Sequence, residues 1–371
     1  MIRRYLYDQV KTDLKKKMVF IAGPRQVGKT TFSKDVISDD GRYLNWDIPE
    51  DREIILNNEI PLEEKIVFDE IHKYKGWRGY LKGIFDKYGN KKKILVVGSA
   101  KLDFYRYGGD SLQGRYFFFR LHPFSVAELK IRDKDKFEKL LKLGGFPEPF
   151  LSDSETEAKR WAREYRSRLI YEEIESLENI SDISKMELLV LRLPDLIGSP
   201  LSVNSLREDL QVSHKTVLRY LEILERLYLI FSIPPFGSPL IRAVKKEKKY
   251  YFYNWSVLSE NLPTAFENMV ASHLLKWIHF EQDTRGRDLE LRYFRDVEGR
   301  EVDFVITERL KPVRFVEVKW RDRKTSKNLK YLKKKFPDVQ AIQVIGEKSF
   351  STETKEGILK KSAIEFLSEL V

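Results

Sequence analysis

Short apolar runs alternate with helical patterns through residues 18–97. Residues 18–22, 66–68 and 94–97 are wholly apolar, which is typical of strands that are buried on both faces of a sheet. The segments 31–37 and 77–88, which lie between these runs, have the composition of helices. This alternation predicts an α/β domain that is built on a parallel sheet.

A different pattern occupies the middle of the chain. Residues 203–210 predict a short helix, and a turn then leads to a second helix that is capped by Ser213. The apolar residues of this second helix share one face, and they are Val217, Tyr220, Leu221, Leu224 and Leu227. Two predicted strands follow, at residues 229–233 and 249–253, so the segment is typical of a winged helix.

The exposed face of the second helix carries His214, Lys215 and Arg219. If the winged helix binds DNA, these side chains meet a groove or the phosphates. If it is a spacer between proteins, they are ordinary solvated side chains. Both interpretations remain open from the sequence.

Glycines and prolines mark the domain boundaries. Residues 144–149 read Gly-Gly-Phe-Pro-Glu-Pro, a strong break in regular structure that ends the first domain. We expect three domains, which cover residues 1–150, 151–250 and 251–371. The last is expected to be a small α/β domain, with a helix at 265–279 and strands at 292–295, 301–306 and 314–320.

Composition narrows the functional classes. The 371 residues include no cysteine, which excludes disulfides and thiolate metal sites. The sequence has no apolar run of membrane-spanning length and no signal-peptide pattern, so we expect a cytoplasmic protein without a membrane partner. The net charge of +11 favours an acidic partner such as nucleic acid, although a basic surface that only aids solubility is the alternative.

The segment 23–30 fits the P-loop pattern G-x-x-x-x-G-K-[ST] at every fixed position. It follows an apolar run and precedes a helical segment, which is the context that the motif requires. In such a loop the backbone N–H groups cradle the phosphates of ATP, Lys29 reaches the β- and γ-phosphates, and the Thr30 hydroxyl binds Mg²⁺. The expected nucleotide-binding residues are Gly23, Pro24, Arg25, Gln26, Val27, Gly28, Lys29, Thr30 and Thr31.

Two carboxylates, Asp69 and Glu70, follow directly on the apolar run 66–68. A buried parallel strand presents functional groups at its carboxyl end, so Asp69 is expected to hold Mg²⁺ and Glu70 to polarise the attacking water. Ser99 ends the next apolar run, where a sensor of the γ-phosphate is expected. Arg115 follows a glycine-rich loop, and both an arginine finger and a structural ion pair remain open for it.

Charged residues also alternate with apolar ones in the C-terminal strands. Asp303 lies on one strand, and Glu317 and Lys319 share a face of the next because strand side chains alternate with period two. Carboxylates that hold Mg²⁺ beside a lysine that positions water suit phosphodiester hydrolysis, and Glu267 is a further candidate ligand. Solvated charges on an alternating strand are the other explanation. The basic stretch at 321–335 could follow a phosphate backbone.

These motifs together resemble the prokaryotic AAA-type ATPases that carry a C-terminal DUF4143 region. The resemblance rests on residues 23–30, 68–73 and 112–115, on the segment at 144–148, and on Glu-Val-Asp-Phe with Glu-Val-Lys near the end. It implies a P-loop NTPase core of the AAA+/ASCE type, a winged helix, and a restriction-endonuclease-like domain similar to PD-(D/E)xK nucleases. Glu267, Asp303, Glu317 and Lys319 match the nuclease positions, whereas Ser99 departs from the asparagine or threonine that is common at the AAA sensor.

The leading hypothesis is a cytoplasmic, Mg²⁺-dependent ATPase that binds or processes DNA, with nuclease activity in the last domain an open question. One alternative is an ATP-driven switch whose nuclease-like domain is only an interaction module. Another is an ATP-gated winged-helix transcription regulator. A homo-oligomer is compatible with each of them.

Overall fold

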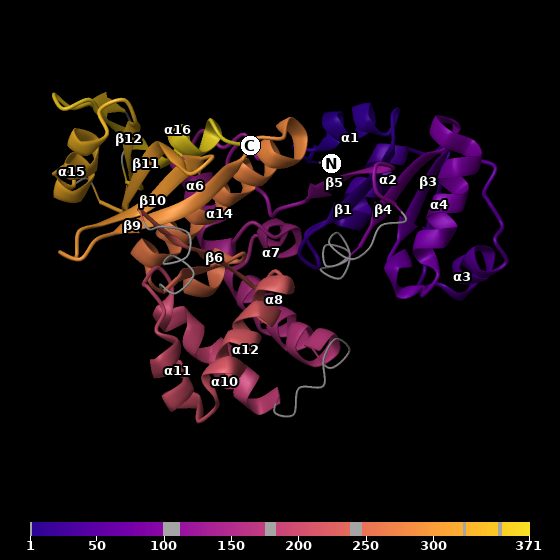
Figure 1. The fold of residues 1–371 in the computed structure, drawn as a ribbon, viewed down its shortest axis with the longest axis horizontal. Coiled ribbons are helices and arrows are strands. Elements are labelled where there is room, and N and C mark those ends of the chain that lie inside the picture. The colour runs from indigo at the N-terminus through magenta and orange to yellow at the C-terminus, as the bar shows by residue number, and fades with distance from the viewer. Residues whose placement is uncertain (1, 99–111, 175–182, 238–246, 322–323, 348–350) are drawn as a thin grey trace. The chain divides into compact units, whose positions relative to one another are not determined.

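The computed structural model describes residues 2–98, 112–174, 183–237, 247–321, 324–347 and 351–371. The chain divides into two compact units, and each is described by itself (Figure 1). The first unit comprises Met1–Pro123 and Asp283–Arg285, and the second comprises Phe124–Gln282 and Gly286–Val371. The first unit therefore ends before the boundary at residue 150 that the sequence predicts, and the three-domain division stays a prediction.

A parallel sheet of five described strands forms the centre of the first unit, in the order β2-β3-β4-β1-β5. The strands are β1 (Met18–Ala22), β2 (Gly41–Asn45), β3 (Lys65–Asp69), β4 (Lys93–Val97) and β5 (Tyr116–Arg120). Every residue of β1 is buried, because β1 pairs in parallel with β4 on one side and β5 on the other. The predicted α/β fold with a parallel sheet is confirmed, and β4 separates the P-loop strand β1 from β3.

Helices connect these strands. They are α1 (Tyr7–Asp13), α2 (Lys29–Ile37), α3 (Pro49–Leu56) and α4 (Trp77–Tyr88), with short 3₁₀ segments η1 (Ile71–Lys73) and η2 (Gly89–Lys91). Leu81 and Ile84 of α4 share one apolar core with Phe20 of β1 and Phe68 of β3. The Phe68 ring meets Tyr80 edge to face, with the ring centroids 5.8 Å apart. This packing fixes the end of β3, where Asp69 lies.

The second unit begins with helices. They are α6 (Lys134–Leu143), α7 (Pro147–Ser152), α8 (Glu155–Arg168), the π-helix η4 (Leu169–Ile174), α10 (Ile183–Arg192), η5 (Leu193–Leu196), α11 (Val203–Leu210), α12 (His214–Arg226), η6 (Trp255–Leu258) and α14 (Leu262–Arg285). As expected, Ser213 caps α12, since its hydroxyl accepts a hydrogen bond from the Thr216 N–H at 3.0 Å. An antiparallel pair, β6 (Ile230–Ile233) and β8 (Lys249–Phe252), follows α12. The elements occur in the predicted order, and their interpretation as a winged helix stays a prediction.

A mixed sheet of seven described strands completes the second unit, in the order β13-β14-β12-β11-β10-β9-β7. The strands are β7 (Pro235–Phe236), β9 (Leu289–Arg295), β10 (Glu301–Glu308), β11 (Lys311–Lys319), β12 (Gln340–Ile345), β13 (Thr352–Glu353) and β14 (Ile358–Ser362), with helices α15 (Lys327–Lys335) and α16 (Ala363–Ser368). The predicted pairing of β9 with β10 is confirmed, and it is antiparallel. Phe304 pairs with Val316, so Asp303 and Glu317 lie beside that pair on neighbouring strands.

Candidate nucleotide site and C-terminal carboxylate centre

The P-loop connects β1 to α2 through two glycines in unusual backbone conformations. Gly23 has φ of 153° and Gly28 has φ of 93°, values that L side chains rarely adopt. A Cβ atom on Gly23 would collide with the backbone carbonyl oxygen of Leu121. Because Gly28 directly precedes α2, the loop delivers Lys29 and Thr30 to the first turn of that helix. Both glycines are therefore required by the backbone path.

The Lys29 side chain lies across its own loop. It is buried, and its Nζ donates hydrogen bonds to the carbonyl oxygens of Gly23 at 2.9 Å and Pro24 at 2.6 Å. Arg4 supports the loop from behind, because its guanidinium donates to the Val27 carbonyl at 2.9 Å and to the His122 carbonyl. Sequence patterns did not reveal Arg4, since its partners are distant backbone atoms.

The remaining predicted loop residues differ in exposure. Pro24 and Val27 are buried, and Arg25 is half-buried, whereas Gln26 and Thr31 are exposed. Gln26 adopts a left-handed conformation with φ of 57°. The loop thus has an apolar inner side, formed by Val27, and a polar outer side.

Thr30 and Asp69, the two predicted Mg²⁺ ligands, lie together. The Thr30 hydroxyl donates to Asp69 Oδ2 at 3.0 Å. The phenol of Tyr43, on β2, donates to the same oxygen. Burial raises the pKa of Asp69, and the hydrogen bond from Tyr43 opposes that rise. Burial and the neighbouring Asp69 charge raise the pKa of Tyr43 as well. A hydroxyl beside a carboxylate is an all-oxygen donor set of the kind that Mg²⁺ prefers, so these residues fit the ion.

Glu70 sits at the turn after β3. Its backbone is left-handed, with φ of 55°, and its N–H donates to the Val97 carbonyl at 3.0 Å. Its carboxylate lies 3.5 Å from His72 Nε2 and 3.5 Å from Lys73 Nζ. A non-glycine residue in this conformation stores strain, which is common at functional sites. Glu70 thus follows Asp69 at the carboxyl end of β3, and its role in hydrolysis stays a prediction.

The two remaining predicted residues of this site have different outcomes. Arg115 forms a bidentate ion pair with Asp86, with Nε–Oδ1 at 2.8 Å and Nη2–Oδ2 at 3.3 Å. In this structure Arg115 therefore has the geometry of a structural ion pair, one of the two roles that the sequence left open. Ser99 lies outside the described residues.

In the second unit, three carboxylates on α14, β10 and β11 influence one another electrostatically. Glu267 Oε1 accepts a hydrogen bond from the Tyr251 hydroxyl at 2.9 Å. Asp303 Oδ2 accepts one from the Val318 N–H at 2.7 Å. Glu317 Oε1 pairs with Lys319 Nζ at 2.9 Å. Burial, and then the charge of Asp303, raise the pKa of both Glu267 and Glu317. The three side chains therefore share one electrostatic environment, which we call the C-terminal carboxylate centre.

This centre differs from the predicted metal site. Among the described residues, no three carboxylate or imidazole side chains come together in a group that could hold a metal ion. Each carboxylate also has a donor within the protein: the Tyr251 hydroxyl for Glu267, a backbone N–H for Asp303 and Lys319 for Glu317. The donor set as arranged here does not fit a three-carboxylate Mg²⁺ site, and we assign no metal chemistry to it.

The predicted DNA-binding residues lie on α12. His214, Lys215 and Arg219 are exposed, and the opposite face of the helix is buried in the second unit. His214 also lines a surface hollow that contains three acidic residues, which are Glu222, Glu225 and Glu247. These carboxylates would repel phosphates on that side of the helix, so the DNA-binding role of α12 stays a prediction.

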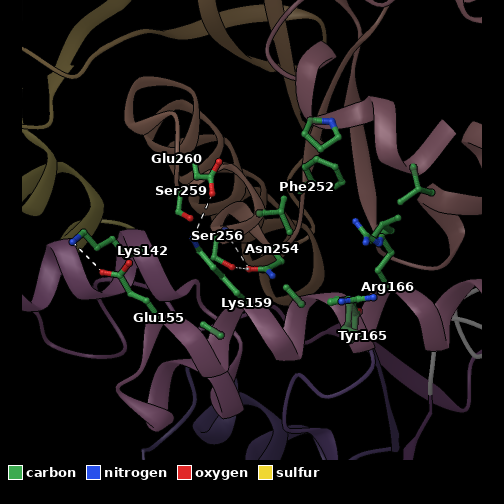
Figure 2. A pocket seen from close by; sticks show the side chains of 17 residues that line it. Lys142, Glu155, Lys159, Tyr165, Arg166, Phe252, Asn254, Ser256, Ser259 and Glu260 are labelled. Atoms are coloured by element: carbon green, nitrogen blue, oxygen red, sulfur yellow. Dashed lines mark hydrogen bonds and ion pairs between the residues drawn. The ribbon is translucent and has the colours of Figure 1, made fainter. Parts of the chain in front are cut away.

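A cavity of about 280 Å³ lies elsewhere in the second unit, between α8 and the segment after β8 (Figure 2). Two lysines of its lining are paired, Lys142 with Glu155 at 3.1 Å and Lys159 with Glu260 at 3.4 Å. The buried Asn254 accepts a hydrogen bond from the Ser256 hydroxyl at 2.8 Å. None of the predicted site residues lines this cavity.

Within the described ranges, no helix combines the length and the apolar character that crossing a membrane needs.

Comparisons with known protein families place three matches along the chain. Residues 15–130 match the model of an AAA domain, 110–265 match a domain of unknown function named DUF8612, and 264–362 match a domain of unknown function named DUF4143. The resemblance to AAA-type ATPases with a DUF4143 region is confirmed by the first and third of these matches. The nuclease-like character of the C-terminal region is not part of what they confirm.

Three curated relatives of this chain are named only as uncharacterized proteins. An uncharacterized protein of Methanocaldococcus jannaschii is 26% identical over 331 residues, which are 78% of this chain and 72% of the relative. One of Haemophilus influenzae is 22% identical over 326 residues, with 77% and 78% covered. One of Mycobacterium tuberculosis is 23% identical over 246 residues and covers 65% of this chain, but the match spans only 55% of that protein.

Solved structures resemble this chain only weakly. A RuvB protein of Thermotoga maritima has a TM-score of 0.30 at 16% identity and covers 61% of this chain and 88% of its own. The ORC1 protein of Aeropyrum pernix in complex with DNA has a TM-score of 0.34 at 14% identity, with 74% and 95% covered. Similarity at this level carries no conclusion about what this chain binds.

Proposed function

We propose that this chain, which joins an AAA-type P-loop ATPase domain to a DUF4143 region, binds ATP with Mg²⁺ and hydrolyses it. The observation that carries the proposal is the contact of Thr30 Oγ1 with Asp69 Oδ2 at 3.0 Å, beside a complete P-loop. A helical hydroxyl and a strand-end carboxylate from segments 39 residues apart meet at one point. Such a meeting is what a nucleotide-bound Mg²⁺ requires.

Each side chain then has a stated task. The backbone N–H groups at the start of α2 face anionic phosphates, and the positive end of the helix dipole favours them. Lys29 would exchange the Gly23 and Pro24 carbonyls for charged phosphate oxygens, which are stronger acceptors. Thr30 and Asp69 would hold Mg²⁺, and the bound ion would neutralise charge on the phosphates. Glu70 would orient the attacking water and accept its proton.

Calorimetric titration of ATP and Mg²⁺ into the protein tests this proposal. In the Lys29→Ala variant the affinity for ATP should fall about tenfold or more, because the cation at the phosphates is lost. Lys75→Ala, which removes an exposed lysine of the same unit, is the matched control and should bind as the wild type does. Unchanged affinity in a folded Lys29→Ala protein would refute the nucleotide site.

We extend the proposal to nucleic acid as the partner, on the support of the net charge of +11 and the dense lysines of α15. Surface lysines bind phosphates without reading sequence, so affinity should depend steeply on salt. Filter binding of a DNA duplex at several salt concentrations, with and without ATP, would measure this.

The engaged carboxylates of the C-terminal carboxylate centre favour a second candidate function, an ATP-driven switch whose last domain does not cleave DNA. Incubation of the protein with labelled DNA and Mn²⁺ distinguishes the two. Cleavage that Lys319→Ala abolishes would refute the switch and restore the nuclease hypothesis.

A further inference from the structure

A buried lysine from outside the DUF4143 match enters the C-terminal carboxylate centre. Lys249, on β8, is 1% exposed, and its Nζ pairs with Glu301 at the start of β10. Burying an ammonium group is costly unless opposite charge compensates it, so the position of Lys249 demands an explanation. The partners of the lysine supply one.

The charges around Lys249 are those of the C-terminal carboxylate centre. Burial lowers the pKa of Lys249, but the charges of Glu267, Asp303 and Glu301 together outweigh burial and raise it. Tyr251 lies two residues further along β8, on the same face of the strand, and donates its hydroxyl to Glu267. Strand β8 therefore contributes both a cation and a hydrogen-bond donor to this centre.

Counting charges shows what Lys249 does. Four acidic side chains lie in or next to the centre, and they are Glu267, Glu301, Asp303 and Glu317. Three basic side chains pair with or act on them: Lys249, Lys319 and Arg295, which lies 3.7 Å from Glu301. Lys249 is the most buried of the three, and the charges of Glu267 and Asp303 raise the pKa of both Lys249 and Lys319, with Glu267 the largest of the charges that act on Lys249.

We propose that the Lys249 ammonium is a built-in cation, which neutralises in this protein the carboxylates that would otherwise attract a divalent metal ion. This inference concerns the second unit alone and is independent of ATP hydrolysis. The sequence pattern predicts a metal site on these carboxylates, yet no three-ligand group is found among the described residues. A lysine that takes the place of the metal ion would explain this difference.

One oxygen remains for a metal ion if the lysine is removed. Glu317 Oε2 is buried and has no hydrogen-bond partner of good geometry among the described residues, although the Ser326 side chain also acts on this carboxylate. Gln343, which faces Glu317 across the β11–β12 register, likewise has a buried side-chain nitrogen without one. The centre therefore contains a carboxylate oxygen that could bind a metal ion. The nearby Lys249 ammonium repels a second cation and so disfavours that binding.

The experiment replaces Lys249 by methionine, which removes the ammonium group and keeps a flexible side chain of similar length. Lys249→Met should bind Mn²⁺ about tenfold or more tightly than the wild type in a calorimetric titration of nucleotide-free protein, because the competing cation is gone. Lys248→Met removes the same charge from an exposed neighbour and should bind Mn²⁺ as the wild type does. Adding Glu317→Gln to Lys249→Met should abolish the gain, which locates the new site.

Two results would overturn the proposal. One is a folded Lys249→Met protein with wild-type Mn²⁺ affinity, and the other is a wild-type Mn²⁺ site that Glu317→Gln removes. If circular dichroism shows that Lys249→Met does not fold, Lys249→Met with Glu301→Gln removes the ion pair as a whole and takes its place in the titration. If that protein also fails to fold, Mn²⁺ during refolding should restore structure, and failure to do so counts against the proposal.

Discussion

Replacing Tyr43 by phenylalanine would measure how much the Tyr43 hydroxyl stabilises ionised Asp69 in the absence of Mg²⁺. The change removes the phenol that donates to Asp69 Oδ2 and leaves the ring, which Lys34 Nζ contacts at 4.8 Å from the centroid. A hydrogen bond to a charged group is worth about 1.5–3 kcal/mol. Because Tyr43 is only half-buried, we take the lower value, about 1.5 kcal/mol, which is about a tenfold bias against ionised Asp69.

The sign of the pH effect follows from the direction of the shift. Burial raises the pKa of Asp69 in the folded protein, so the folded state holds the proton more tightly than the unfolded chain does. This contribution to stability is full below the unfolded pKa and is lost as the pH rises through the raised folded pKa. Loss of the Tyr43 hydrogen bond raises the folded pKa further, so in Tyr43→Phe the loss of stability should extend to higher pH.

Melting temperatures of nucleotide-free protein would measure the effect when recorded from about pH 3, below the unfolded Asp value of about 3.9, to about pH 8. ATP turnover with Mg²⁺ should fall as the pH is lowered, because protonated Asp69 cannot hold the ion. This fall should begin at a higher pH in Tyr43→Phe than in the wild type. Tyr88→Phe is the control, because no hydrogen bond from the Tyr88 hydroxyl is seen among the described residues. Superimposable pH profiles for Tyr43→Phe and the wild type would refute this account of Asp69.

Three further predictions concern other parts of the molecule. Glu70→Gln should leave ATP binding intact and slow turnover about a hundredfold or more in a phosphate-release assay, because the general base is lost, and turnover within about twofold would indicate a structural role. Gly23→Ala should cost about 1–3 kcal/mol of stability in urea unfolding and weaken ATP binding, because φ of 153° and the Leu121 carbonyl both exclude a Cβ atom. Gly79→Ala, inside helix α4 with open space around the added atom, should instead stabilise by about 0.5–1 kcal/mol and leave ATP binding unchanged. Affinity for duplex DNA should fall by orders of magnitude between about 50 and 200 mM salt, and a flat dependence would argue against phosphate contacts.

The sequence was sufficient for the features that local pattern determines. Apolar runs located the buried strands of the first unit, since a strand that is buried on both faces must be apolar throughout. The P-loop motif located Lys29 and Thr30, and the end of an apolar run located Asp69. Strand alternation placed Glu317 and Lys319 on one face, where they pair at 2.9 Å.

Other site residues depend on contacts that no local pattern contains. Arg4 supports the P-loop through carbonyls 23 and 118 residues away, and Tyr43 reaches Asp69 from the neighbouring strand β2. Lys249 ends the charged run 245–249, directly before the aromatic residues 250–253, and this pattern does not mark it as a buried lysine. The donors that engage the carboxylates of the predicted metal site likewise come from β8 and from a backbone N–H, so no local pattern reveals them.

The two polar centres balance negative charge in different ways, and the difference bears on which one is prepared for a metal ion. Asp69 is held by two neutral hydroxyl groups, from Thr30 and Tyr43, so its charge is solvated but not cancelled by a direct ion pair. The C-terminal carboxylate centre instead contains two ammonium groups, Lys249 and Lys319, in ion pairs with Glu301 and Glu317. A divalent cation gains most where carboxylate charge is not yet neutralised. Mg²⁺ should therefore favour the site at Asp69, and the C-terminal carboxylate centre should accept a metal ion only after Lys249 is removed.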